Sequence, residues 1–186
     1  MLCHVCYAEP DDMPDCAICR GSGRATSIPL CVDAWNEVVP GLFQGGHDVR
    51  SQSRTACVVG DEFDLVVSMT TREGYGPADG VEHHVARMAD AGVDAGIAAR
   101  VDELAGVVAE AVRAGRRVLV RCSGGLNRSG LVVASALVRL GHGPDEAIAL
   151  VRRSRGPWAL TNAAFVKHLR SHGGQEGPRS RPAGSV

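Results

Sequence analysis

A cysteine and an arginine six positions apart, with two glycines between them, are the residues of this sequence best suited to chemistry. Cys122 follows the apolar run 118–120, and Arg128 precedes a second apolar segment. A thiolate is a strong nucleophile, and a guanidinium binds two oxygens of a phosphate or carboxylate with its planar fork. Gly124 and Gly125 allow the chain to curl so that its backbone N–H groups point at a common anion. The pattern therefore predicts a nucleophilic thiolate in an anion-binding loop.

The elements expected on either side of this loop support that prediction. Residues 118–120 are typical of a buried strand, and residues 129–140 are apolar nearly all round, which predicts a helix at the heart of the fold. A helix N-terminus offers free N–H groups and a positive dipole end, which favour a bound phosphate and an ionised thiol. The alternative interpretation is a glycine-rich strand–helix turn with an incidental buried cysteine.

Strand and helix patterns alternate along the middle of the chain. Strands are expected at 37–39 and 42–44, as a hairpin, and at 65–69, 82–88 and 118–120. Helices are expected at 97–112, 129–140 and 145–154, and from Thr161, as N-cap, to residue 170. This alternation predicts an α/β fold with a mainly parallel central sheet flanked by helices.

The nucleophile segment resembles the signature of the cysteine-based protein tyrosine phosphatases, His-Cys-x-x-Gly-x-x-Arg-Ser/Thr, and is closest to the compact dual-specificity group. The resemblance extends over about residues 35–169, because residues 39–46 resemble the opening hairpin of that group and residues 145–156 resemble the helix after its loop. It implies a phosphocysteine on Cys122, a phosphate held by Arg128, and a hydrogen bond from Ser129 to the departing thiolate. It also implies that catalysis needs no cofactor, and an N–H cradle formed by Ser123, Gly124, Gly125, Leu126, Asn127 and Arg128.

The same family uses an upstream aspartic acid, which protonates the leaving oxygen and then activates water. Asp90 follows the expected strand and lies 32 positions before Cys122, a spacing that resembles the family's. Asp94 is a second candidate, but a carboxylate there also suits the start of the next helix. Asp90 is therefore the expected general acid, and the alternative is that both are solvated loop carboxylates.

The residue before the nucleophile departs from the family pattern, because Arg121 stands where the family usually has histidine. Neighbours on a strand point to opposite faces, so the Arg121 side chain should point away from Cys122. The departure leaves open a weaker activity, an unusual substrate, or a phosphate-binding adaptor that has lost turnover. His83 and His84 are expected to be ordinary strand residues rather than replacements.

The expected substrate is a phosphorylated protein, with phosphotyrosine first and phosphoserine or phosphothreonine in addition. Phosphoinositides and RNA 5′-phosphates remain alternatives for the same loop. A rhodanese-type sulfurtransferase also places a cysteine after a strand, but the flanking segments fit that family less well.

Two Cys-x-x-Cys pairs near the N-terminus predict a structural zinc site, because four thiolates suit tetrahedral Zn²⁺. The four ligands would be Cys3, Cys6, Cys16 and Cys19. Residues 1–28 contain no core of their own, so a metal would have to supply their folding energy. The second pair resembles the Cys-x-x-Cys-x-Gly-x-Gly unit of DnaJ-type chaperones. Disulfides or redox-active thiols are the alternatives, and a zinc knuckle would offer a docking point for a partner.

Composition sets the remaining expectations. The chain has 186 residues, of which 45% are hydrophobic, and a formal net charge of -1, which argues against a strongly basic nucleic-acid binder. It contains no apolar run long enough to cross a membrane. The odd count of seven cysteines indicates a reducing cytoplasm, and the richness in Ala, Gly, Val and Arg is typical of a bacterial or phage genome. The sequence thus divides into a cysteine-rich segment 1–28, a catalytic domain 30–172 and a tail 173–186 that is expected to be disordered.

Overall fold

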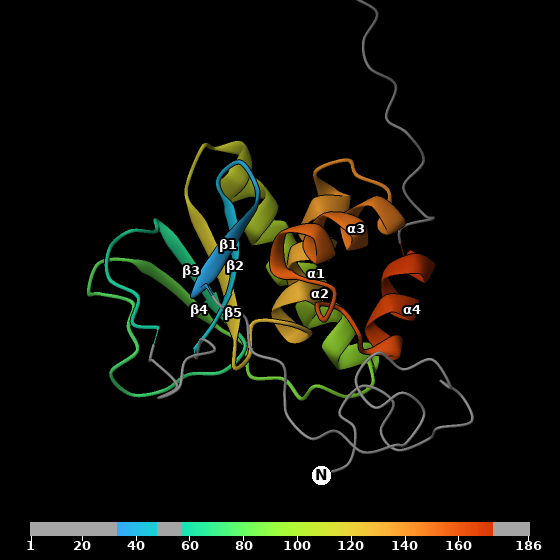
Figure 1. Ribbon diagram of the computed structural model, residues 1–186, viewed down its shortest axis with the longest axis horizontal. Helices are drawn as coiled ribbons and strands as arrows, with labels where there is room; N and C mark the ends of the chain where they lie inside the picture. Colours follow the sequence, from blue (N-terminus) through green and yellow to red (C-terminus); the bar gives the residue numbers. More distant parts are fainter. Residues whose placement is uncertain (1–32, 48–56, 173–186) are drawn as a thin grey trace, which may run out of the picture.

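The computed structural model describes residues 33–47 and 57–172. Within these ranges, strands and helices alternate much as the sequence predicts (Figure 1). The strands are β1 (Trp35–Val39), β2 (Leu42–Gly46), β3 (Leu65–Ser68), β4 (Glu82–Val85) and β5 (Val118–Cys122). The helices are α1 (Ala95–Arg113), α2 (Arg128–Arg139), α3 (Pro144–Arg155) and α4 (Ala163–His172). The predicted cysteine-rich segment 1–28 and tail 173–186 lie outside the described residues.

The five strands form one sheet in the order β1-β2-β5-β3-β4. β1 and β2 pair antiparallel as the predicted hairpin, while β2, β5, β3 and β4 run parallel to one another. β5 lies at the centre, and all five of its residues are buried. The predicted mainly parallel sheet is therefore confirmed, and its central strand is the one that ends at Cys122.

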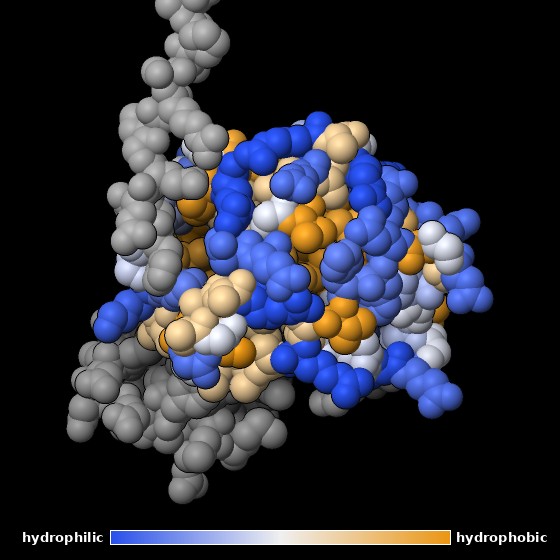
Figure 2. Space-filling model, turned by 180° about the vertical axis from the view of Figure 1, so that it is seen from behind, coloured by the Kyte–Doolittle hydropathy of each residue, from blue (hydrophilic) through white to orange (hydrophobic). Residues whose placement is uncertain are grey.

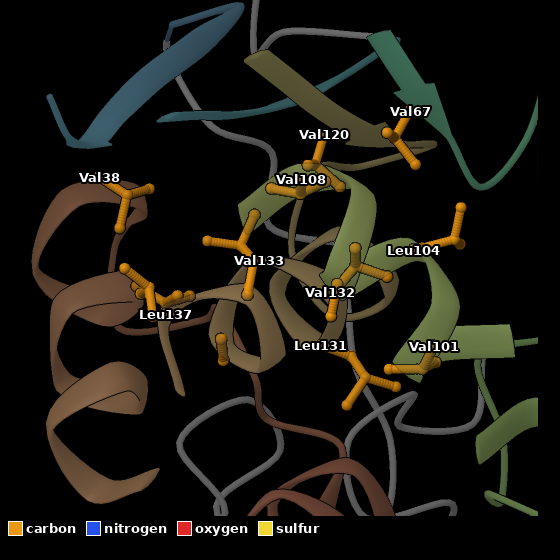
Figure 3. Close-up of a cluster of buried hydrophobic side chains, with 14 of the residues drawn as sticks. Val38, Val67, Val101, Leu104, Val108, Val120, Leu131, Val132, Val133 and Leu137 are labelled. Atoms are coloured by element: carbon orange, nitrogen blue, oxygen red, sulfur yellow. The ribbon is translucent and has the colours of Figure 1, made fainter. Parts of the chain in front are cut away.

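The two faces of the sheet are covered differently. Figure 1 shows the helices gathered on one side of the strands, and Figure 3 shows Val67 and Val120 of the sheet pointing toward Val108 of α1 and Val132 of α2. These side chains belong to the main hydrophobic core. The opposite face carries a smaller cluster, in which Val59 and Phe63 pack on alternate strand residues. Alternation along each strand thus supplies both faces with apolar side chains.

Helix ends follow the sequence in one case and depart from it in another. Asp94 caps α1, because its side chain accepts a hydrogen bond from the Ile97 N–H at 2.8 Å. The prediction that Thr161 caps the last helix is wrong. The side-chain oxygen of Asn162 takes that role, because it accepts from the N–H groups of Ala164 and Phe165 at 3.0 and 3.4 Å. The Thr161 hydroxyl instead donates to the side-chain oxygen of Asn127.

β4 is shorter than predicted and ends at Val85 instead of residue 88. Its partner β3 ends at Ser68, which accepts the last bond of the pair from the Ala86 N–H at 3.0 Å. A strand cannot continue beyond its partner without losing ladder hydrogen bonds, so residues 86–90 leave the sheet as a loop. This loop carries Asp90 toward the carboxyl end of β5.

One face of the molecule is mixed in polarity. Figure 2 shows hydrophobic residues broken into small patches by hydrophilic ones. Among the described residues, Val58 and Val85 are the large hydrophobic side chains that stand exposed. None of the helices between residues 33 and 172 that the structure describes combines the length and hydrophobicity needed to span a bilayer.

Candidate functional site

Cys122 is the last residue of β5, at the carboxyl end of the central parallel strand. Its side chain is 2% exposed, and its Sγ lies 3.4 Å from the Oγ of Ser129, the second residue of α2. The strand, the loop and the helix therefore bring the predicted nucleophile, Cys122, next to Ser129, the residue predicted to hydrogen-bond its sulfur. Sites in parallel sheets form at this end of the strands.

The loop between Cys122 and α2 curls tightly at one of its two glycines. Gly125 has φ +67°, and a Cβ placed on it would lie 2.5 Å from the carbonyl carbon of Gly45. Gly124 lacks a positive φ, and a Cβ there would meet nothing within 4 Å. Only Gly125 is therefore required by the backbone, whereas the sequence pattern suggested both.

Neighbouring elements hold the carbonyl groups of this loop. The Gln44 side chain of β2 donates to the carbonyls of Gly125 and Leu126 at 3.1 and 3.2 Å. Arg155, at the end of α3, donates to the Gly125 carbonyl at 3.1 Å, and the backbone N–H of His47 donates to the Ser123 carbonyl at 2.8 Å.

The loop N–H groups are left for a ligand. Within the described residues, no backbone carbonyl accepts a hydrogen bond from the N–H groups of residues 123–128. With the carbonyls held by outside partners, these donors suit an anion inside the loop. Neither Gln44 nor Arg155 was identified as a brace from the sequence, although both lie in segments that resemble the family's.

Arg128 is the first residue of α2 and keeps part of its guanidinium uncommitted. One Nη donates to the carbonyl of Met88 at 3.3 Å. The Nε is buried and has no hydrogen-bond partner among the described residues. A buried donor without a partner is costly, and a bound phosphate oxygen would satisfy it.

Asp90 is held against the same loop by two asparagine side chains. Asn127 donates to one carboxylate oxygen at 3.1 Å, and Asn162 donates to the other at 2.8 Å. The side-chain oxygen of Asn127 in turn accepts from the backbone N–H groups of Thr161 and Asn162 at 2.9 and 3.2 Å. Asp94, the rival candidate, is occupied as the cap of α1. Sequence reasoning missed Asn162, because its neighbour Thr161 is an equally good capping residue.

Arg121 points to the opposite face of the sheet from Cys122, as predicted from alternation. It is 1% exposed and donates to the Ser68 hydroxyl at 2.9 Å and to the carbonyls of Tyr75 and Gly76 at 2.8 and 2.5 Å. Burial lowers the pKa of Arg121 to about 10, so the side chain remains a cation at neutral pH. It therefore does not take the place of a histidine beside the sulfur.

The two strand histidines have separate surroundings. His83 lies 2.9 Å from the Ser68 hydroxyl, and burial, with the nearby charge of Arg121 as the second cause, lowers the pKa of His83 below its usual value. His84 contacts Glu82 at 2.8 Å at the surface. His83 is thus part of the cluster around Arg121 rather than of the loop around Cys122.

The predicted metal ligands all belong to the segment 1–28. Cys3, Cys6, Cys16 and Cys19 lie outside the described residues, so the zinc site stays a prediction. Within residues 33–47 and 57–172, no group of three or more His, Cys, Asp or Glu side chains is arranged to hold a metal ion. Cys57 is a buried thiol.

Comparisons with known proteins agree with this geometry. Residues 49–175 match the family model of the dual specificity phosphatase catalytic domain. Human DUSP28 is 27% identical with a TM-score of 0.59, over 79% of this chain and 95% of that one. A mouse dual specificity phosphatase, complexed with zinc tungstate, is 26% identical with a TM-score of 0.58, over 80% and 90% of the two chains.

More distant structures share the fold alone. PTPMT1 in complex with PI(5)P is 17% identical with a TM-score of 0.57, over 77% of this chain and 96% of that one. No curated protein matches the sequence significantly.

Proposed function

The chain belongs to the dual specificity phosphatase family and is a cysteine-dependent phosphatase, and we propose that it dephosphorylates protein side chains, with phosphotyrosine as the first substrate. One observation carries the proposal. The Sγ of Cys122 lies 3.4 Å from the Ser129 hydroxyl, where a central parallel strand meets a helix N-terminus. A phosphate dianion suits this position, because the free N–H groups, the helix dipole and Arg128 all favour negative charge there.

In the first step, the Cys122 thiolate attacks phosphorus, and the bond from phosphorus to the tyrosine oxygen breaks. Asp90 donates its proton to the departing oxygen, so the side chain leaves as a neutral phenol. Arg128 and the N–H groups of residues 123–128 hold the three equatorial oxygens while this transfer occurs. The product is a phosphocysteine.

In the second step, water attacks the phosphorus, and the Asp90 carboxylate takes a proton from that water. The bond from sulfur to phosphorus breaks, and Cys122 leaves as a thiolate. The Ser129 hydroxyl, 3.4 Å from the sulfur, is suited to donate a hydrogen bond to the charge that forms there. Inorganic phosphate is released, and the site returns to its starting state.

Hydrolysis of para-nitrophenyl phosphate tests this assignment. We expect Cys122→Ser to abolish turnover while retaining phosphate binding, since a serine hydroxyl is not ionised at neutral pH. Arg128→Ala should lower kcat/KM by about 10²-fold or more, as the removal of other preorganised charge donors does. If the wild-type protein binds phosphopeptides without hydrolysing them, the result contradicts the proposed activity and favours an adaptor that has lost turnover.

The role of Asp90 is tested by comparing leaving groups. Asp90→Asn should slow hydrolysis of phenyl phosphate by about 10²- to 10⁴-fold, the usual range for general acid catalysis. It should slow para-nitrophenyl phosphate less, because nitrophenolate departs without a proton. Asp94→Asn is the matched control and should affect neither reaction strongly. Equal losses on both substrates would contradict the acid role.

The substrate class is tested by measuring kcat/KM on phosphotyrosine, phosphoserine and phosphothreonine peptides. A soluble phosphoinositide and an RNA 5′-phosphate are measured as alternative substrates. We expect the highest kcat/KM for phosphotyrosine. A higher value for the lipid or the RNA would move the assignment to a non-protein substrate, which the PTPMT1 complex with PI(5)P illustrates for a protein of the same fold.

We also propose that residues 30–172 form the catalytic domain and that residues 1–28 bind one structural Zn²⁺ through Cys3, Cys6, Cys16 and Cys19. The support is the spacing of the two Cys-x-x-Cys pairs. A reducing cytoplasm would keep these thiolates available as ligands and leave the segment free to dock to a partner. Purified protein should contain one zinc per chain, and Cys16→Ser should lose it. Metal-free protein would rule out the site.

A further inference from the structure

The rim of the Cys122 loop carries an exposed arginine on the segment that follows β3. A guanidinium Nη of Arg72 approaches the Oγ of Ser123 to 3.5 Å, and Ser123 is the first residue of the loop. The Arg72 guanidinium also lies over the ring of Tyr75, 5.6 Å from its centroid. This stacking orients the cation, and the side chain remains exposed to solvent.

A second exposed arginine comes from the segment that follows β4. Arg87 donates to the Thr71 hydroxyl at 3.1 Å, which joins this segment to the one that carries Arg72. The next residue, Met88, accepts a hydrogen bond from Arg128 at 3.3 Å. The two segments therefore meet beside the loop. One contacts Ser123 at its start, and the other contacts Arg128, the helix residue that follows it.

The charge on this rim is not cancelled at Arg87. Arg87 forms no ion pair among the residues that the structure describes, and the Asp90 carboxylate is held by Asn127 and Asn162. A substrate whose phosphate sits in the loop would place its neighbouring groups against these two arginines. Successive residues of an extended peptide are about 3.4 Å apart, so an acidic side chain next to the phosphorylated residue lies within their reach.

We propose that Arg72 and Arg87 form a second anion site on the rim of the Cys122 loop, which selects phosphopeptides with acidic residues beside the phosphorylated one. This selection rests on the proposed function and names a feature of its substrate. An acidic peptide is favoured over a lipid surface, because membrane binding through charge uses clusters of four to eight basic side chains. Two arginines on an open rim suit one or two carboxylates.

The test is a ratio of kcat/KM values for two peptides. One peptide carries glutamates on both sides of phosphotyrosine, and the other carries glutamines in the same places. Any general loss of turnover cancels in this ratio. Exposed ion pairs contribute up to about 1 kcal/mol, which corresponds to about 5-fold. With about 3-fold from each of the two arginines, we expect wild-type protein to prefer the acidic peptide by roughly 10-fold.

Single variants should lower the preference and the double variant should remove it. Arg72→Ala and Arg87→Ala are each expected to reduce the ratio by about 3-fold. Added salt should reduce the wild-type ratio and leave that of the double variant unchanged, since exposed charges are screened. Arg113→Ala is the matched control. Arg113 is exposed at the carboxyl end of α1, and the chain from there enters the start of β5, so it lies at the opposite end of that strand from Cys122.

Three results would overturn the proposal. The first is a wild-type ratio near one, and the second is a preference for the acidic peptide that survives in the double variant. The third is a double variant that loses more kcat/KM on a soluble phosphoinositide than on the acidic peptide. A failure of turnover itself is a separate result. In that case the same ratio is measured as dissociation constants of the Cys122→Ser protein, and its response to Arg72→Ala and Arg87→Ala supports or overturns the rim independently of catalysis.

Discussion

Arg121 shows how a single residue can depart from a family pattern without entering the site. It is a buried cation whose hydrogen bonds go to one hydroxyl and two backbone carbonyls, those of Ser68, Tyr75 and Gly76. These bonds tie β5 to β3 and to the segment that carries Arg72. Arg121 therefore has a structural role, because its side chain lies on the face of the sheet away from Cys122.

Replacing Arg121 should destabilise the fold. Arg121→Met leaves the carbonyl of Gly76 without its donor, and a buried acceptor in that state costs about 1–3 kcal/mol. The carbonyl of Tyr75 loses one of its two donors and keeps the Val59 N–H at 3.2 Å. Arg121→His introduces the residue that the family usually has, yet its shorter side chain would not replace both carbonyl bonds, so we expect a loss there too. Urea unfolding measures both variants. The exposed Arg153→Met serves as control, and an unchanged midpoint for Arg121→Met would contradict this role.

At the scale of elements, the Cys122 loop depends on how closely β2 approaches it. Gly46 is also constrained, because a Cβ on it would lie 2.8 Å from the carbonyl carbon of Gly124. Gln44 of the same strand binds two loop carbonyls. Gly46 and Gln44 of β2 therefore help to set the shape of a loop that begins 77 residues after Gly46 (123 − 46).

The two loop glycines offer a matched comparison. Gly125→Ala should destabilise the protein by about 1–2 kcal/mol from its positive φ alone, with a further cost from the 2.5 Å contact with Gly45. It should also weaken the binding of inorganic phosphate. Gly124→Ala places its methyl group in open space, and we expect both properties to stay near wild type. Urea unfolding and calorimetric titration with phosphate measure the pair, and similar losses in both variants would contradict the geometry.

At the scale of the whole molecule, the sheet separates two environments. The helical face holds the main apolar core, and the other face holds a small apolar cluster beside the polar group formed by Arg121, Ser68 and His83 on adjacent strands. Partial burial and the neighbouring Arg121 cation both disfavour the protonated form of His83. The stability of the molecule should therefore depend on pH through His83.

The sign of this dependence follows from the lowered pKa of His83. Its ordinary value is 6.5, and the folded protein holds it lower. As the pH falls below 6.5, the unfolded chain binds more protons than the folded one, so the free energy of unfolding decreases. His83→Gln should remove part of this decrease. Unfolding in urea between about pH 8 and pH 5 measures it, with pH 8 as the reference for each protein. Parallel curves for the two proteins would contradict the prediction.

The sequence by itself determined the features that depend on near neighbours along the chain. A nucleophile after a buried strand, a glycine turn, an arginine six positions on and an apolar helix are all local patterns, and the structure has each of them where the pattern predicts. The strand–helix alternation likewise predicted the parallel sheet, because periodicity of two or 3.6 residues records which side of an element is buried. Asp94 as a helix cap belongs to the same class.

Only the tertiary structure decided which distant residues complete the site. The Asn162–Asp90 contact spans 72 positions, the Gln44–Gly125 contact 81, and the Arg72–Ser123 contact 51. Periodicity carries no information about such pairs, since they meet through the order of strands in the sheet rather than through spacing in the chain. The same reason explains the error at Thr161 and Asn162: either residue can cap a helix locally, and the long-range contacts of Asn127 with Thr161 and of Asp90 with Asn162 set their final roles.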